Sequence, residues 1–185
     1  MDQALDRALD VFWRKGYEGA TLVDLTAAMG INPPSLYAAF GNKESLFCKA
    51  LERYDALRNA FWDEAIRKPT ALEVAQSLLN GAAKFMTDPC HPRGCLGVQG
   101  ALVCGDEARA VRTALETQRA AGQAKVRERL KLAKKERDLP GGSDPAVLAR
   151  YLTTVIEGMA VQAAAGASRK DLERVADTAL RAWPN

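Results

Sequence analysis

The sequence predicts an all-α protein in two parts, a three-helix unit over residues 1–45 and a larger helical unit over residues 46–185. Apolar residues recur at intervals of three and four through most of the chain, which is the period of an amphipathic helix. Glycine and proline, which end helices, stand between these periodic segments. The hydrophobic content of 48% and the charged content of 26% are those of a folded globular protein.

Residues 21–43 predict two short helices joined by a tight turn. Thr21 can cap the first helix, with Asp24 at the acidic position of a capping box. Gly30 can end that helix, because glycine adopts a positive φ without steric cost. Asn32 can cap the second helix, and the two prolines after it break no internal hydrogen bond there.

The second of these helices has one apolar face. Leu36 and Phe40 are four residues apart and face inward, which leaves Ser35, Tyr37 and two alanines on the outer face. A short helix with a small, polar and aromatic outer face suits the major groove of DNA. An amphipathic helix predicted over residues 2–15 would complete a three-helix core.

Helical periodicity continues through the larger unit. A long helix from Asn42 to about Pro69 would join the two units physically. The other predicted helices cover residues 70–87, 95–104, 107–137, 144–165 and 168–182. Cations outnumber acids ten to six over residues 106–139, and a solvated helix face explains this excess better than a nucleic-acid surface.

The order of residues in the first 50 positions resembles the helix-turn-helix signature of the tetracycline-repressor-like (TetR) family of transcriptional regulators. The matching segments are Gly30-Ile31-Asn32, Ser35-Leu36-Tyr37, Phe40 and Asn42-Lys43-Glu44-Ser45-Leu46. Pro34 and Ala39 depart from the pattern, since the family often has glycine and histidine there. The resemblance implies a regulator, most often a repressor, that binds a palindromic double-stranded DNA operator as a homodimer. Its half-sites would lie about 34 Å apart.

The resemblance also implies which residues contact DNA. Thr21 and Lys43 would contact phosphate, and Tyr37 would contact phosphate or a base edge. The residues on the groove-facing side would be Asn32, Pro34, Ser35, Ala38 and Ala39. Over residues 1–50, five Lys and Arg oppose six Asp and Glu, a net charge of −1. DNA binding would therefore depend on local geometry and not on a bulk positive charge.

In the larger unit, the resemblance implies a pocket for a small-molecule effector of unknown identity. The candidate lining residues are mostly apolar: Tyr54, Leu57, Phe61, Leu78, Leu79, Phe85, Cys95, Val98, Gln99 and Leu102. The same residues at helical spacing also describe an ordinary core, and the sequence leaves both interpretations open. The last two helices would form a four-helix bundle with those of a second subunit. The candidate interface residues are Tyr151, Leu152, Val155, Met159, Leu172, Val175 and Ala179, with intrachain core as the alternative.

The cysteines suggest a second mode of regulation. Cys95 is predicted at the N-terminus of a helix beside Arg93, and both features favour a reactive thiol. The alternative function is therefore a redox- or electrophile-sensing regulator that acts through Cys95, although free cysteines are more often plain core. Cys90, His91 and Cys95 match no familiar zinc spacing, so the sequence predicts no metal site and no cofactor.

Other classes of protein have little support in the sequence. No nucleophile, phosphate-binding or dinucleotide motif is present, which argues against an enzyme. A helical dimer that has lost DNA binding is a third hypothesis, favoured only by the slight acidity of the first 50 residues. No run approaches the roughly 20 apolar residues of a membrane span, and the acidic start is no signal peptide. Four cysteines without a regular framework indicate reduced thiols, so we expect a cytoplasmic protein.

Overall fold

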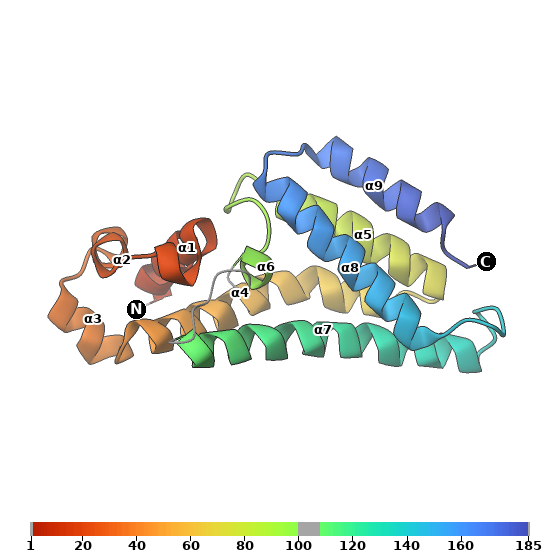
Figure 1. Ribbon diagram of the computed structural model, residues 1–185, viewed down its shortest axis with the longest axis horizontal. Coiled ribbons are helices and arrows are strands. Elements are labelled where there is room, and N and C mark those ends of the chain that lie inside the picture. The colour runs from red at the N-terminus through yellow and green to blue at the C-terminus, as the bar shows by residue number, and fades with distance from the viewer. Residues whose placement is uncertain (1, 100–107, 185) are drawn as a thin grey trace.

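The computed structural model describes residues 2–99 and 108–184, and in these ranges every regular element is a helix (Figure 1). The helices are α1 (Asp2–Gly19), α2 (Leu22–Met29), α3 (Pro33–Phe40), α4 (Lys43–Ile66), α5 (Ala71–Met86), α6 (Leu96–Gln99), α7 (Arg109–Lys135), α8 (Pro145–Ala164) and α9 (Arg169–Arg181). The predicted all-α fold is confirmed. Of the helix predicted over residues 95–104, only α6 lies in the described part of the chain.

The helix ends follow local sequence signals. Gly16 interrupts α1 with a φ of 69° and a ψ of 177°, after which the chain makes one more helical turn to Gly19. Thr21 caps α2, because the Asp24 N–H donates to its hydroxyl and the Asp24 carboxylate accepts from its N–H. Gly30 ends α2 in the left-handed region, with a φ of 69°. These ends leave a short turn between α2 and α3, as in a helix-turn-helix.

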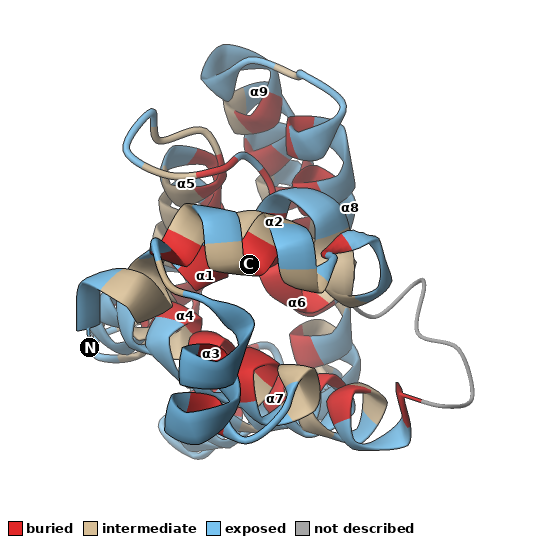
Figure 2. Cartoon of the chain, turned by 90° about the vertical axis from the view of Figure 1, so that its left-hand side faces the viewer, coloured by how far each residue is buried: buried red, intermediate tan, exposed pale blue. Residues whose placement is uncertain are grey.

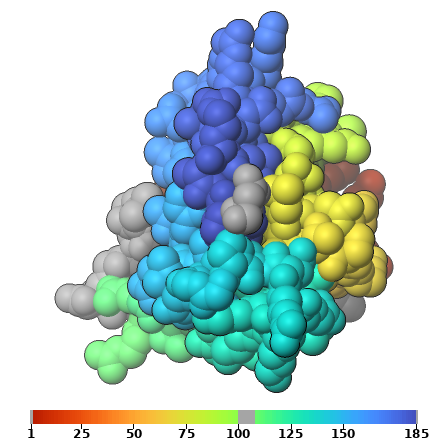
Figure 3. Space-filling view, turned by 90° about the vertical axis from the view of Figure 1, so that its right-hand side faces the viewer, coloured from red at the N-terminus to blue at the C-terminus, as the bar shows by residue number. Residues whose placement is uncertain are grey.

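Two long helices form the base of the molecule. α4 has 24 residues and is therefore about 36 Å long, and α7 lies beside it (Figure 1). α1, α2 and α3 cluster at one end of α4, whereas α5, α8 and α9 are layered at the other. Viewed from that second end, α9 lies over α5 and against α8 (Figure 3). α4 thus connects the two ends of the molecule as one continuous rod.

The buried side chains form two clusters that divide along α4. We call residues 2–54 the head, because the buried residues of α1, α2 and α3 pack with those of α4 up to Tyr54. We call residues 55–99 and 108–184 the body. The head cluster also takes in Leu96, Val111 and Leu115 of the body, and Phe85 and Cys95 pack against both clusters. The head therefore rests on α6 and on the start of α7.

The apolar face of α4 differs from the predicted one at Leu57. We expected this side chain to point inward, but it is 47% exposed. The buried face after Tyr54 runs instead through Arg58 and Trp62, each four residues further along. That face meets α7, whereas Leu57 lies at an outer groove between α4 and α5.

Candidate DNA-binding and effector sites

The outer face of α3 is exposed in the described part of the chain. Leu36 and Phe40 are buried against the head core, whereas every residue predicted to face the groove is exposed. These exposed residues are Asn32, Pro34, Ser35, Tyr37, Ala38 and Ala39. The whole outer surface of α3 shows as exposed at the head end of the molecule (Figure 2). The helix is therefore available to a groove without rearrangement.

Caps fix both helices of this motif. The Ser35 N–H donates to Asn32 Oδ1 over 2.9 Å at the start of α3. At α2, Lys15 Nζ lies 2.7 Å from Asp24 Oδ1. The hydrogen bond from Lys15, followed by those from Thr21, lowers the pKa of Asp24 to about 2. This network connects α1 to the first turn of α2. Thr21 remains exposed at the N-terminus of α2, where a phosphate contact is predicted.

Lys43 is the first residue of α4 and follows α3 closely in the chain. Asn42 caps α4 by accepting the Ser45 N–H over 2.7 Å. The Lys43 ammonium lies 4.4 Å from the centre of the Tyr17 ring, and its partial burial there lowers its pKa. A cation at a helix N-terminus, where free N–H groups gather, suits a phosphate ligand.

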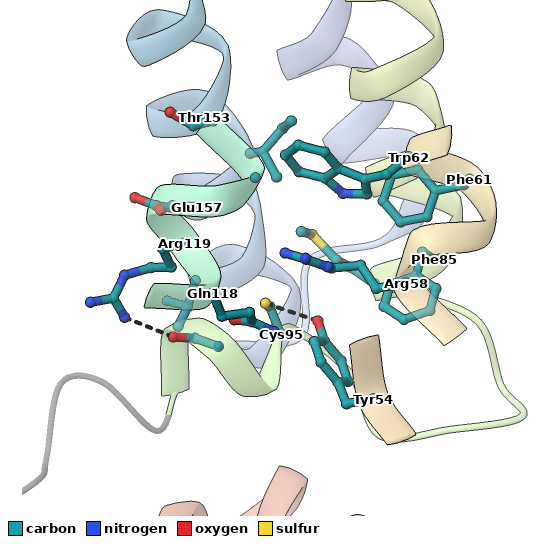
Figure 4. Close-up of a pocket in the computed structure, with 15 residues that line it drawn as sticks. Tyr54, Arg58, Phe61, Trp62, Phe85, Cys95, Gln118, Arg119, Thr153 and Glu157 are labelled. Carbon is teal, nitrogen blue, oxygen red and sulfur yellow. Dashed lines mark hydrogen bonds between the residues drawn. The ribbon is translucent and has the colours of Figure 1, made fainter. Parts of the chain in front are cut away.

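A small cavity lies between α4, α5, α6, α7 and α8 (Figure 4). Its volume is about 40 Å³, which is room for one or two water molecules. Its walls combine aromatic rings with a few polar side chains. The lining residues are Tyr54, Arg58, Phe61, Trp62, Phe85, Met86, Cys95, Gly97, Val98, Gln118, Arg119, Gly122, Thr153, Ile156 and Glu157.

The structure brings some of the predicted pocket residues together and separates others. Tyr54, Phe61, Phe85, Cys95 and Val98 all line the cavity. The other described members of the predicted set lie elsewhere, and Leu102 falls outside the described residues.

Four predicted pocket residues occupy other surroundings. Leu78 and Leu79 are fully buried in the core of the body without lining the cavity. Leu57 lines a separate groove on the outside of α4 and α5. Gln99 lies at a hollow against residues 14–19 of α1. Gln99 therefore belongs to the contact between α6 and the head.

The polar residues Arg58, Gln118, Arg119, Thr153 and Glu157 line the cavity but are not among the predicted pocket residues. Arg58 and Trp62 follow Tyr54 at intervals of four on one face of α4, so helical spacing could have found them. Gln118 and Gly122 have the same spacing on α7. Nothing local in the sequence indicates that these two faces meet, because the contact between α4 and α7 joins residues about 60 positions apart.

Cys95 lies in the cavity wall, where the Tyr54 hydroxyl donates to its sulfur over 2.9 Å (Figure 4). Burial raises the pKa of Tyr54 well above its ordinary value, so this hydroxyl stays protonated and remains a donor. The prediction that Cys95 precedes a helix agrees with α6. The expected partnership with Arg93 does not appear, because that guanidinium donates to the carbonyls of Ala163 and Ala167 at the end of α8.

His91 connects the loop before α6 to the head. Its ring stacks on Trp13 of α1, with centroids 4.6 Å apart and planes inclined by 18°, and it also contacts Phe85. Trp13 in turn meets Tyr54 edge to face at 4.7 Å. Among the residues described, no group of three or more His, Cys, Asp or Glu side chains could hold a metal ion. His91 therefore acts here as a packing group.

The residues predicted for the dimer interface divide into two sets. Leu152, Met159, Leu172 and Ala179 are buried inside the chain's own core. Tyr151, Val155 and Val175 line an outer groove between α8 and α9, and Ala179 also borders it. Nearby on the outer surface of α8, Val147 and Val161 are 63% and 47% exposed. The apolar surface available to a second subunit is therefore made by these outer residues.

Comparisons with known proteins agree over nearly the whole chain. Residues 4–49 match the family of bacterial regulatory proteins called the tetR family, and residues 71–179 match the tetracyclin repressor-like C-terminal domain. The HTH-type transcriptional repressor ComR of Escherichia coli K12 is 32% identical over 99% of this chain and 88% of its own length. The HTH-type transcriptional repressor AcnR of Corynebacterium glutamicum is 30% identical, over 95% of this chain and 87% of AcnR.

A solved structure is closer still. A cysteine-substituted form of the TetR family transcriptional regulator CifR, complexed with 26-base-pair double-strand operator DNA, has 43% identity and a TM-score of 0.95. The similarity covers 100% of this chain and 96% of that one. No helix in the described ranges combines the length and apolar character needed to cross a membrane. The relatives confirm that the protein is a DNA-binding transcriptional regulator and not an enzyme, and the chain belongs to the tetR family of bacterial regulatory proteins.

Proposed function

We propose that this protein is a cytoplasmic repressor that binds a palindromic operator as a homodimer and is released by a small-molecule effector. The observation that carries the proposal is the exposed outer face of α3, on a chain that superimposes on CifR bound to its operator. One α3 per subunit would enter the major groove, with Ser35 and Tyr37 among its outward side chains. Lys43 and Thr21 would contact the flanking phosphates.

The outer surface of α8 and α9 supports the homodimer. Val147, Val161 and Val175 are large apolar side chains that remain exposed in one chain. Tyr151 and Val155 border the groove between the two helices. A two-fold axis at this surface would bury these side chains against their own copies. The distance between the two heads would then depend on how each head sits on its body.

The cavity offers a physical route from an effector to the head. Tyr54 lies in the cavity wall and touches Trp13 of α1, and Trp13 touches His91 in the loop before α6. A ligand that moves Tyr54 or α6 would therefore act on the base of the head through one layer of side chains. It would lower operator affinity by no more than its own preference for the released arrangement.

The test is binding of the purified protein to the DNA that flanks its own gene, measured across a salt series. The proposal requires tight binding to one palindromic segment and a steep loss of affinity with salt. Analytical ultracentrifugation of the complex should give two subunits per operator. Binding that never exceeds the non-specific level would reject the repressor, and one subunit per site would reject the homodimer.

A second candidate function is sensing by the thiol of Cys95. The supporting observation is the hydrogen bond from Tyr54, which places the sulfur in the cavity wall and next to the contact with Trp13. Modification of that sulfur would break the hydrogen bond and disturb the same route to the head. Cys95→Ser is the deciding variant: if it is released from the operator as readily as the wild type, the thiol is not the sensor.

A further inference from the structure

Among residues 2–99 and 108–184, two polar atoms in the cavity wall are buried without a hydrogen-bond partner. They are Nε of Arg58, which is a donor, and Oε1 of Gln118, which is an acceptor. Gln118 is only 7% exposed. Buried polar groups in proteins nearly always have a partner, so an unpaired donor and an unpaired acceptor in one cavity indicate a missing group that supplies both.

The orientation of the Gln118 carboxamide is fixed by its neighbours. Its Nε2 donates to Asp55 Oδ1 over 2.5 Å, and since a carboxylate only accepts, the carboxamide oxygen must point the other way. That oxygen lies against Gly97, where a Cβ atom would approach it to 2.5 Å. Arg58 is tied to the same Asp55 oxygen over 3.3 Å. One carboxylate therefore holds both side chains while leaving one polar atom of each unpaired.

The rest of the wall suits a flat apolar body. Four aromatic rings line the side of the space formed by α4 and α5, those of Tyr54, Phe61, Trp62 and Phe85 (Figure 4). The Arg58 guanidinium itself lies 5.1 Å from the centre of the Trp62 ring. Aromatic rings pack on one another and on guanidinium groups with favourable geometry, so a single planar ring would find contacts along this side of the cavity.

The charges around the cavity argue for an uncharged ligand. Arg58 and Arg119 are balanced by Asp55 and Glu157, so the formal sum of the four is zero. A carboxylate ligand would face the Gln118 oxygen without a proton to donate. An ammonium ligand would face Arg58. A buried charge without a counter-ion is strongly disfavoured, so both ions should bind poorly.

Space for such a ring is available next to the cavity. Phe61 and Phe85 line the cavity and also a groove of about 400 Å³ on the outside of α4 and α5. Rotation of these two rings would join the two spaces. The cavity of about 40 Å³ could then admit a molecule larger than the water that fits it now.

We infer that the effector is a small uncharged aromatic molecule whose polar end both donates and accepts a hydrogen bond, such as an aryl alcohol or a primary aromatic amide. Its oxygen would accept from Arg58 Nε, and its O–H or N–H would donate to Gln118 Oε1. The inference rests on the proposed function, because it names the ligand class of the same cavity.

The experiment uses five one-ring probes on the full-length protein. Benzyl alcohol and benzamide carry a donor and an acceptor, benzoate carries only acceptors, benzylammonium carries only donors, and toluene carries neither. Dissociation constants come from calorimetry, and release of labelled operator comes from fluorescence anisotropy. Benzyl alcohol and benzamide should bind about tenfold more tightly than the other three, because only they satisfy both unpaired atoms.

Variants assign the preference to the two side chains. Arg58→Met and Gln118→Leu should each reduce the advantage of benzyl alcohol over toluene to about twofold or less. Arg58→Lys keeps the charge without the Nε donor and should lose the advantage as well, which guards against a variant that folds poorly. Arg67→Met changes an exposed position directly after α4, and Gln123→Leu changes a half-buried position on α7. Neither residue lines the cavity, so both variants should keep the full preference.

Several results would overturn the inference. Tightest binding of benzoate or of benzylammonium would show that charge, not the paired donor and acceptor, is recognised. An unchanged preference in Arg58→Met and Gln118→Leu would place the ligand elsewhere. Binding of none of the probes would mean that water satisfies the two atoms. Operator binding without a probe is measured in the same titrations, so failure of the repressor itself is recognised separately from failure of this ligand class.

Discussion

Replacing Lys43 by alanine removes the cation at the first residue of α4, which follows α3 closely in the chain. Because the proposed dimer presents this residue twice, the variant loses two phosphate contacts per operator. Each contact contributes about 0.9 to the slope of log affinity against log salt, so the slope should become shallower by about 1.8. The same relation gives an affinity loss of about 30-fold at physiological salt.

Lys49→Ala is the matched control for this variant. The Lys49 ammonium lies 5.2 Å from the centre of the Phe40 ring, much as that of Lys43 lies 4.4 Å from the Tyr17 ring. Each variant loses one positive charge and one cation–π contact of about 0.5–1 kcal/mol, so their stabilities to urea should be similar. Only Lys43→Ala should change the salt slope. The assignment is refuted if Lys43→Ala keeps the wild-type slope, or if both variants lose equal affinity.

Three further predictions test the head and the body. Ser35→Ala on the exposed face of α3 should change the relative affinity for operators that differ at one base pair by about tenfold, while leaving the salt slope intact. Binding to a set of operators with single base-pair substitutions measures this. Equal weakening on every sequence would contradict a specificity role. Asp24 has a pKa of about 2 in the folded protein against an ordinary 3.8, so its contribution to stability is present above about pH 4 and is lost as the pH falls towards 2. Asp24→Asn should therefore show a smaller drop in melting temperature than the wild type over that range, and parallel curves would show that this carboxylate is not involved. Gly81→Ala would place a Cβ atom 2.6 Å from the Phe61 ring and should lower the free energy of unfolding, measured in urea, by about 1–3 kcal/mol. Ser77→Ala, at the same groove, serves as the control. An equal loss of stability in both variants would argue against the predicted clash.

The head could be predicted closely because its determinants are local. Thr21, Gly30 and Asn32 act on backbone groups within three or four residues of themselves, so their effect can be read from spacing alone. The observed caps and the left-handed glycine agree with those predictions. The exposed face of α3 follows from the same spacing, since Leu36 and Phe40 fix which side is buried.

The cavity could be predicted only in part, because it is made where distant helices meet. Tyr54 and Phe61 were identified from the apolar content of α4, yet Arg58 between them was not, since a charged residue on an apolar face is usually assigned to solvent. Gln118 joins the site through Asp55, 63 positions away. Leu78 shows the opposite error: its apolar character predicted burial correctly, but not which of two buried surroundings it would occupy.

The loop between α5 and α6 is fastened at three points to three different parts of the molecule. His91 is stacked on the head, Arg93 is bonded to the end of α8, and Cys95 accepts from Tyr54 of α4. Residues 91–95 thus connect three parts of the molecule, so a displacement at one of these contacts would strain the other two. Ring stacking weakens within a few ångströms of separation, so any movement of the head away from the body would loosen the contact between His91 and Trp13. The position of the head is therefore coupled through this loop to the end of α8 and to the cavity wall.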